Sequence, residues 1–137
     1  MISKYFIVIL FFLLPLTQIF SQDNSPIDNE LSDCMNKNPS TQGMIKCIDN
    51  AYKQWDDELN NYYKKLTVIL DDEGKANLKD AQRKWIEFRD LEFKNLEYIY
   101  SKKDGTMYQP MQASDRMEFI KKRALELKSY YELLTEY

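Results

Sequence analysis

Apolar side chains recur at steps of three and four residues along most of the chain after residue 42, which is the spacing of one face of an α-helix. Three such stretches predict helices over about 42–70, over about 75–100, and from residue 114 or 115 to about 134. Their apolar positions are Met44, Cys47, Ile48, Ala51, Trp55, Leu59, Tyr62, Leu66 and Ile69; then Leu78, Ala81, Trp85, Phe88 and Leu91; then Met117, Ile120, Ala124, Leu127, Tyr131 and Leu134.

Polar turns delimit these helices. Thr41 is expected to cap the first one, and the acidic run 71–74 is expected to end it at Gly74. The stretch 101–112 holds a Gly and a Pro and reads as a loop, while 31–35 is expected to form a short turn of helix. No alternating β-branched run appears beyond the N-terminal apolar segment, so nothing predicts a strand.

The N-terminus has the pattern of a secretory signal peptide. Met1–Lys4 carries one positive charge, Tyr5–Leu14 is apolar without interruption, and Ser21 offers a small residue at the cut. The rival reading is a retained membrane anchor, but the apolar run is shorter than the ~20 residues that a spanning helix needs. We therefore predict a signal peptide over 1–21, no stable membrane insertion after its removal, and a periplasmic or secreted protein.

Residues 22–30 are polar and are expected to form a flexible leader, followed by one helical domain over 31–137. The two cysteines, Cys34 and Cys47, both lie in the exported part, where an oxidising compartment favours their pairing. The predicted fold is therefore all-α, an antiparallel bundle of three main helices plus a short N-terminal helical element pinned by a disulfide.

Composition and charge exclude several classes of function. Removal of 1–21 leaves 22 acidic and 18 basic residues, a net charge of −4, which argues against nucleic acid and is compatible with a basic protein partner. Many soluble domains are equally acidic, so charge alone does not identify a partner. His is absent, the cysteines are expected to pair with each other, and the carboxylates lie next to each other in sequence rather than across a cleft. We expect no enzyme activity, no metal site and no cofactor.

Four polar residues, Gln82, Arg89, Asp90 and Glu92, lie on or beside the apolar face of the second predicted helix, whereas a plain amphipathic helix carries its charges on the opposite face. A solvated helix edge is the simple explanation for any one of them. As a group they favour a network of hydrogen bonds and ion pairs between helices. The residues assigned to this network are Asn60 from the first helix, Gln82, Arg89 and Asp90 from the second, and Arg123 from the third.

Aromatic residues are abundant, with ten Tyr, seven Phe and two Trp. Most are expected in the core, because aromatic rings supply much of the buried area of a small bundle. Others are candidates for contact with a protein partner, where Tyr and Trp are enriched. The candidates are Tyr108 and Tyr130, together with Asp104 in the predicted loop.

These segments together resemble the lysozyme inhibitor LprI-like N-terminal domain family of bacterial exported proteins. The resemblance covers about 34–127, most of the mature chain. Its residues are Cys34, Thr41, Met44, Cys47, Tyr52, Asp56, Leu59, Asn60, Tyr63, Leu66, Leu78, Ala81, Gln82, Arg83, Trp85, Ile86, Phe88, Arg89, Asp90, Glu92, Gly105, Pro110, Met111, Arg123 and Leu127.

The chain departs from the family at three positions. The family often has Glu where Gly43 stands, which would weaken the first turn of the helix here. It often has two further cysteines, at positions matching Phe93 and about Asp115. Loss of both is what a lost disulfide would look like, with Phe93 filling the space by packing.

The resemblance implies a compact helical domain in the cell envelope or outside the cell. The expected function is that of an exported, non-enzymatic helical binding module that inhibits lysozyme by steric block of its substrate cleft. The alternative is a structural or assembly protein of the cell envelope with another protein as its partner. The sequence alone leaves the oligomeric state open.

Overall fold

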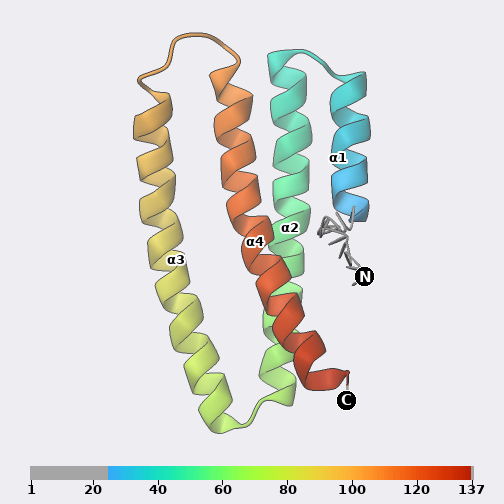
Figure 1. Ribbon diagram of the computed structural model, residues 1–137, viewed down its shortest axis with the longest axis vertical. Coiled ribbons are helices and arrows are strands. Elements are labelled where there is room, and N and C mark those ends of the chain that lie inside the picture. The colour runs from blue at the N-terminus through green and yellow to red at the C-terminus, as the bar shows by residue number, and fades with distance from the viewer. Residues whose placement is uncertain (1–24, 137) are drawn as a thin grey trace, which may run out of the picture.

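The computed structural model describes residues 25–136, so the predicted signal peptide lies outside the described residues. Four helices follow one another in this part of the chain: α1 (Pro26–Lys37), α2 (Thr41–Ile69), α3 (Asp72–Tyr100) and α4 (Tyr108–Thr135). Consecutive helices run in opposite directions (Figure 1). The predicted all-α antiparallel bundle with a short, disulfide-pinned N-terminal element is confirmed.

The core lies between α2 and α4, which share most of the contacts between helices. Because α3 brings the chain back, α2 and α4 run in the same direction, and α4 crosses over α2 toward its C-terminal end (Figure 1). The buried residues come from the predicted apolar faces of these two helices. They are Ile48, Ala51, Trp55, Leu59, Leu66, Met117, Ile120, Ala124 and Leu127.

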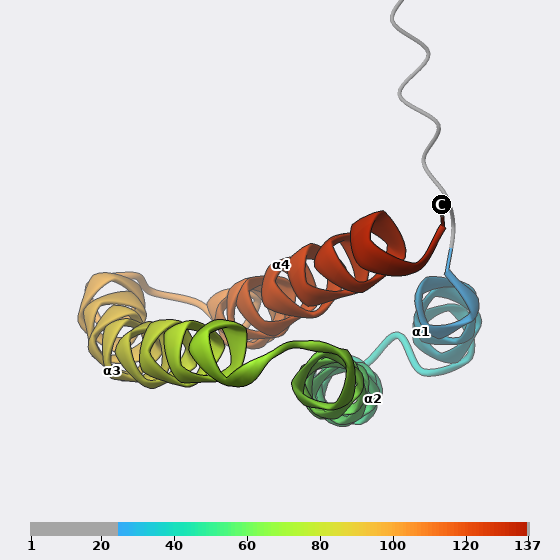
Figure 2. The same ribbon diagram turned by 90° about the horizontal axis from the view of Figure 1, so that it is seen from below.

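α3 lies at the edge of the bundle, on the far side of α2 and α4 from α1 (Figure 2). Gln82 is its one buried residue, while Phe88 and Leu91 are 56% and 64% exposed. The apolar face predicted for this helix is confirmed for Leu78 and Trp85, which pack against the core cluster, and wrong for Ala81, Phe88 and Leu91, which are exposed. The inward face is centred between Trp85 and Arg89, because α3 packs mainly on α4, whose Phe119 contacts Trp85.

α1 begins at Pro26, so the prediction of a flexible leader up to residue 30 is wrong for the part that the structure describes. The Ser25 side chain accepts a hydrogen bond from the Asp28 backbone N–H at 3.2 Å, and Pro26 occupies the first turn, where no backbone donor is needed. Ile27 packs against the core cluster. The helix is thus started by its own cap and held by an apolar contact.

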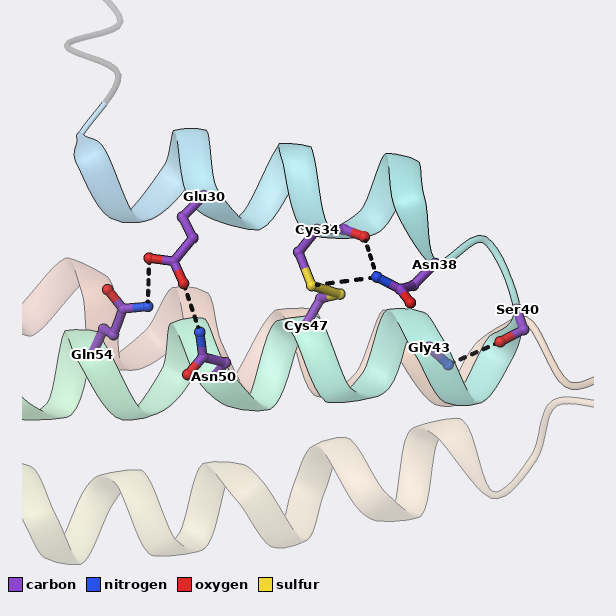
Figure 3. The surroundings of a disulfide bond; sticks show 8 residues. All are labelled: Glu30, Cys34, Asn38, Ser40, Gly43, Cys47, Asn50 and Gln54. Atoms are coloured by element: carbon purple, nitrogen blue, oxygen red, sulfur yellow. Dashed lines mark hydrogen bonds between the residues drawn. A yellow bond between two sulfur atoms is a disulfide. The ribbon is translucent and has the colours of Figure 1, made fainter.

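The disulfide between Cys34 and Cys47 joins α1 to α2, with Cα atoms 5.7 Å apart, as predicted. Glu30 adds two hydrogen bonds, from Asn50 Nδ2 at 3.0 Å and from Gln54 Nε2 at 3.1 Å (Figure 3). α1 is therefore fixed to α2 at more than one point along its length.

Three further helix ends differ from the prediction. Ser40, not Thr41, caps α2. Gly74 is not a stop, because the Asp71 side chain accepts from its N–H and starts α3 there. α4 begins at Tyr108 rather than at 114 or 115, because the buried Pro110 fits in a first turn whose N–H groups have no helical acceptor.

Between residues 25 and 136, no helix is both long and apolar enough to span a bilayer.

Candidate functional site

The structure brings together two of the five residues assigned to the polar network. Arg123 Nε donates to Gln82 Oε1 at 3.0 Å, and both residues are only 8% exposed. The guanidinium also donates to Glu126 Oε2 at 2.5 Å and lies 5.8 Å from the centre of the Trp85 ring. This arginine therefore links α3 to α4 at the edge of the core.

The other three residues form hydrogen bonds only along their own helices. Asn60 Nδ2 donates to the Asp56 backbone oxygen at 2.8 Å. Arg89 donates through two nitrogens to Asp90 Oδ1, at 2.9 and 2.7 Å. Within residues 25–136 none of these three side chains makes a hydrogen bond to another helix. The interhelical network thus contains one buried pair and its immediate neighbours.

Tyr130, one of the predicted contact residues, is 42% exposed and donates its hydroxyl to Glu126 Oε1 at 2.9 Å. Burial acts to raise the pKa of Glu126, but the hydrogen bonds from Arg123 and Tyr130 outweigh burial and hold that pKa below its usual value. The same hydrogen bond, in which the tyrosine keeps its proton, raises the pKa of Tyr130. The Tyr130 ring is therefore partly exposed to solvent, while its hydroxyl is fixed by Glu126 one turn earlier on α4.

The loop 101–107 between α3 and α4 carries the second predicted contact residue, Asp104, which is exposed. Gly105 has a φ of 110°, a left-handed conformation that glycine adopts without strain. Turn hydrogen bonds brace both sides, from Lys103 N to Tyr100 O at 3.1 Å and from Tyr108 N to Gly105 O at 3.4 Å. The loop is therefore a defined turn at one end of the bundle.

Two tyrosines, one at each end of this loop, fix the helix ends that it joins. Tyr100 donates its hydroxyl to Asp115 Oδ2 at 2.6 Å, and its ring lies 6.4 Å from that of Tyr108, the third predicted contact residue. The hydrogen bond to the Asp115 carboxylate raises the pKa of Tyr100. A hollow of about 460 Å³ lies beside these residues and includes Asp104 in its lining.

Phe119 is the main feature of the site region that the sequence reasoning missed. Its ring contacts Trp85, Phe88 and Phe93 at centroid distances of 5.8, 5.7 and 5.9 Å. It was missed because it lies one residue before a core position, off the stripe defined by the three-and-four spacing. Phe93 packs here, with the Arg116 guanidinium 5.5 Å from its ring centre.

A groove of about 480 Å³ between the start of α1, α2 and α4 was also missed, because it depends on the early start of α1. Its lining includes Ile27, Trp55, Tyr62 and Leu125, with Asp57 on its polar side. Among the described residues, no group of three or more Cys, Asp and Glu side chains is placed to hold a metal ion.

The chain matches the protein family described as "Lysozyme inhibitor LprI" over residues 34–127. It is also similar to the crystal structure of an uncharacterised protein from Burkholderia thailandensis, with a TM-score of 0.76 and 28% sequence identity. That likeness covers 82% of this chain and 56% of the Burkholderia chain, so this protein spans little more than half the length of its relative. No curated protein matches the chain. The family match extends over most of the described helices and includes both cysteines of the disulfide, and the chain belongs to the LprI lysozyme inhibitor family.

Proposed function

We propose that this protein is an exported, non-enzymatic binding module that inhibits lysozyme by covering its substrate cleft. The observation that carries the proposal is the family match over residues 34–127, because that family is described by lysozyme inhibition. The disulfide between α1 and α2 supports export, since such bonds persist in oxidising compartments.

The loop 101–107 is the part of the surface that best suits entry into a cleft. Its residues are exposed, it lies where two helices end, and turn hydrogen bonds and the Tyr100–Asp115 bond hold its shape. A loop that is already ordered loses less conformational entropy on binding than a mobile one. The loop therefore favours a steric mechanism in which a preformed projection blocks access to the substrate.

The charge of the loop side chains favours the lysines, and not Asp104, as the residues that face the lysozyme cleft. Lysozyme hydrolyses its substrate with a pair of carboxyl groups. Lys102 and Lys103 are exposed and carry the charge that such a pair attracts, whereas Asp104 would meet a charge of its own sign unless it pairs with a basic residue at the rim. The acidic balance of the rest of the chain would speed the encounter with a basic lysozyme.

The test is a lysozyme inhibition assay on the mature, oxidised protein, with chicken-type, goose-type and invertebrate-type enzymes side by side. Three variants locate the site. Lys102→Glu combined with Lys103→Glu reverses the basic charge of the loop, Asp104→Asn removes its acidic charge, and Lys64→Glu is a control on an exposed position of α2. We expect the double lysine variant to lose inhibition and the control to retain it.

A loss of inhibition in Asp104→Asn alone would instead assign the contact to the carboxylate. Equal inhibition by all loop variants would exclude the loop as the blocking element. Full activity of all three lysozymes at a large excess of the protein would refute the inhibitor function and favour the alternative, an envelope assembly protein. Its partner would then be sought by pull-down from envelope extracts.

A further inference from the structure

One face of α3 carries four apolar or aromatic residues at heptad spacing, interrupted by Lys84 and Asn95, and is largely uncovered by the other described helices. We call this face the α3 seam. Alternating steps of three and four, as in a coiled coil, connect its members. They are Ala81, Lys84, Phe88, Leu91, Asn95 and Tyr98.

The seam lies beside the face of α3 that packs on α4, and Phe88 at its margin also contacts Phe119 of α4. Phe88, Leu91 and Tyr98 are 56%, 64% and 65% exposed, and Ala81 is exposed as well. The exposed parts of the three large side chains come to roughly 400 Å². An apolar patch of that size on a soluble protein often marks an interaction site.

We propose that a second copy of this chain covers the seam, with the two α3 helices antiparallel about a two-fold axis. In an antiparallel coiled coil, a seam residue that begins a three-residue step faces a seam residue of the partner helix that ends such a step. With the axis between residues 89 and 90, Phe88 of one copy faces Leu91 of the second copy. The same register places Ala81 opposite Tyr98, so that a small side chain meets a large one.

The charged residues beside the seam select this orientation. Glu87 is 54% exposed and accepts from Lys84 Nζ of its own helix at 2.7 Å, and Lys94 is exposed. The antiparallel register places Glu87 and Lys94 opposite each other twice, once on each side of the axis, so that the carboxylate can bind both lysines. A parallel pair would instead place Glu87 beside Glu92 of the second copy, and Lys84 beside Lys84. Like charges at such positions are destabilising, whereas opposite charges favour pairing.

The size of the seam sets the expected affinity. A standard interface buries about 800 Å² on each partner, so the apolar part supplies about half of that area and the flanking charged side chains supply the rest. A weak dimer with a dissociation constant of micromolar order is expected. It does not depend on lysozyme inhibition, so either proposal can fail alone.

The test is sedimentation equilibrium of the mature, oxidised protein from low to high micromolar concentration. Leu91→Glu places a charge in the centre of the seam and is expected to leave a monomer throughout this range. Leu133→Glu is the matched control, because Leu133 is also 64% exposed but lies near the end of α4. The control is expected to keep the wild-type dissociation constant, and far-UV circular dichroism checks that both variants are folded.

Charge exchange tests the orientation. Glu87→Lys alone and Lys94→Glu alone should each raise the dissociation constant roughly tenfold at low salt, and the double exchange should restore it. A wild-type protein that stays monomeric, or a dimer that survives Leu91→Glu, would overturn the proposal. A double exchange that fails to restore pairing would overturn the antiparallel register.

Discussion

Arg123 and Arg89 both lie beside Trp85, with their guanidinium carbons 5.8 and 5.6 Å from the ring centre, yet their surroundings predict different effects of substitution. Arg123 is 8% exposed and bonds to the buried Gln82, whereas Arg89 bonds to Asp90, whose side chain is 56% exposed. Arg123→Ala should therefore be far more destabilising than Arg89→Ala.

The magnitude follows from what each substitution leaves behind. Without Arg123, the buried Gln82 oxygen has no partner, which costs about 1–3 kcal/mol, and the removed side chain leaves a void beside Trp85. The half-exposed Glu126 adds at most about 1 kcal/mol, since water can solvate it. The expected loss for Arg123→Ala is about 3 kcal/mol in the free energy of unfolding. For Arg89→Ala it is about 1 kcal/mol, because Asp90 stays solvated and only the packing of a side chain that is 24% exposed against Trp85 is lost.

Urea denaturation followed by far-UV circular dichroism measures both values. Tryptophan fluorescence is the less suitable signal, because both arginines lie close to Trp85 and would change its emission in the folded state. Gln82→Leu is a useful companion variant, since it removes the oxygen and leaves Arg123 with Glu126 alone. A loss for Arg89→Ala as large as that for Arg123→Ala would refute the reasoning and restore the wider polar network that the sequence predicts.

Three further predictions concern single features of the fold. Replacing Cys34 and Cys47 with serine should lower the free energy of unfolding by about 3 kcal/mol, and circular dichroism should show loss of no more than the helix of α1. Gly43→Ala should destabilise by about 1–2 kcal/mol in the same urea assay, because a Cβ there would lie 2.7 Å from the backbone oxygen of Asn38. The pKa of Glu126 is lower in the folded protein than its usual 4.5, so its contribution is present above that pH and is lost as the pH falls through the folded value. Glu126→Gln should therefore flatten the decline in stability between about pH 5 and pH 3 by a few tenths of a kcal/mol, as measured by urea titrations across that range.

The apolar spacing was a sound guide to α2 and α4, because these helices bury one face against each other and the spacing reports burial directly. For α3 it was right for Leu78 and Trp85 but not for Phe88 and Leu91, which satisfy the same spacing and are more than half exposed. A helix at the edge of a bundle has two candidate faces, and single-chain periodicity does not say which one the neighbour covers. The contact of Trp85 with Phe119 decides it, and that contact joins residues far apart in the sequence.

The helix ends show a different limit. Ser25, Ser40 and Asp71 each cap a helix, but Thr41 and Gly74 stand nearby and satisfy the same local rules. Local sequence identifies a set of possible caps, and the packing of the whole helix selects one. The same holds for the polar candidates, where only the pair of Gln82 and Arg123 meets across helices.

The order of the helices in space has a consequence for how the chain can be divided. The core is formed by the first and last long helices, while the middle of the chain, α3, passes along the outside with one buried residue. α3 packs on α4 through Trp85, Phe93 and the Gln82–Arg123 hydrogen bond, and it also tethers α2 to α4 at high local concentration. A single cut near the N-terminal end of α3 would leave α1 with α2 as one fragment and α3 with α4 as the other, with the complementary apolar faces of α2 and α4 intact. Because the core residues of α2 and α4 would lie on different fragments, the two fragments are expected to associate through the α2–α4 contact when they are mixed.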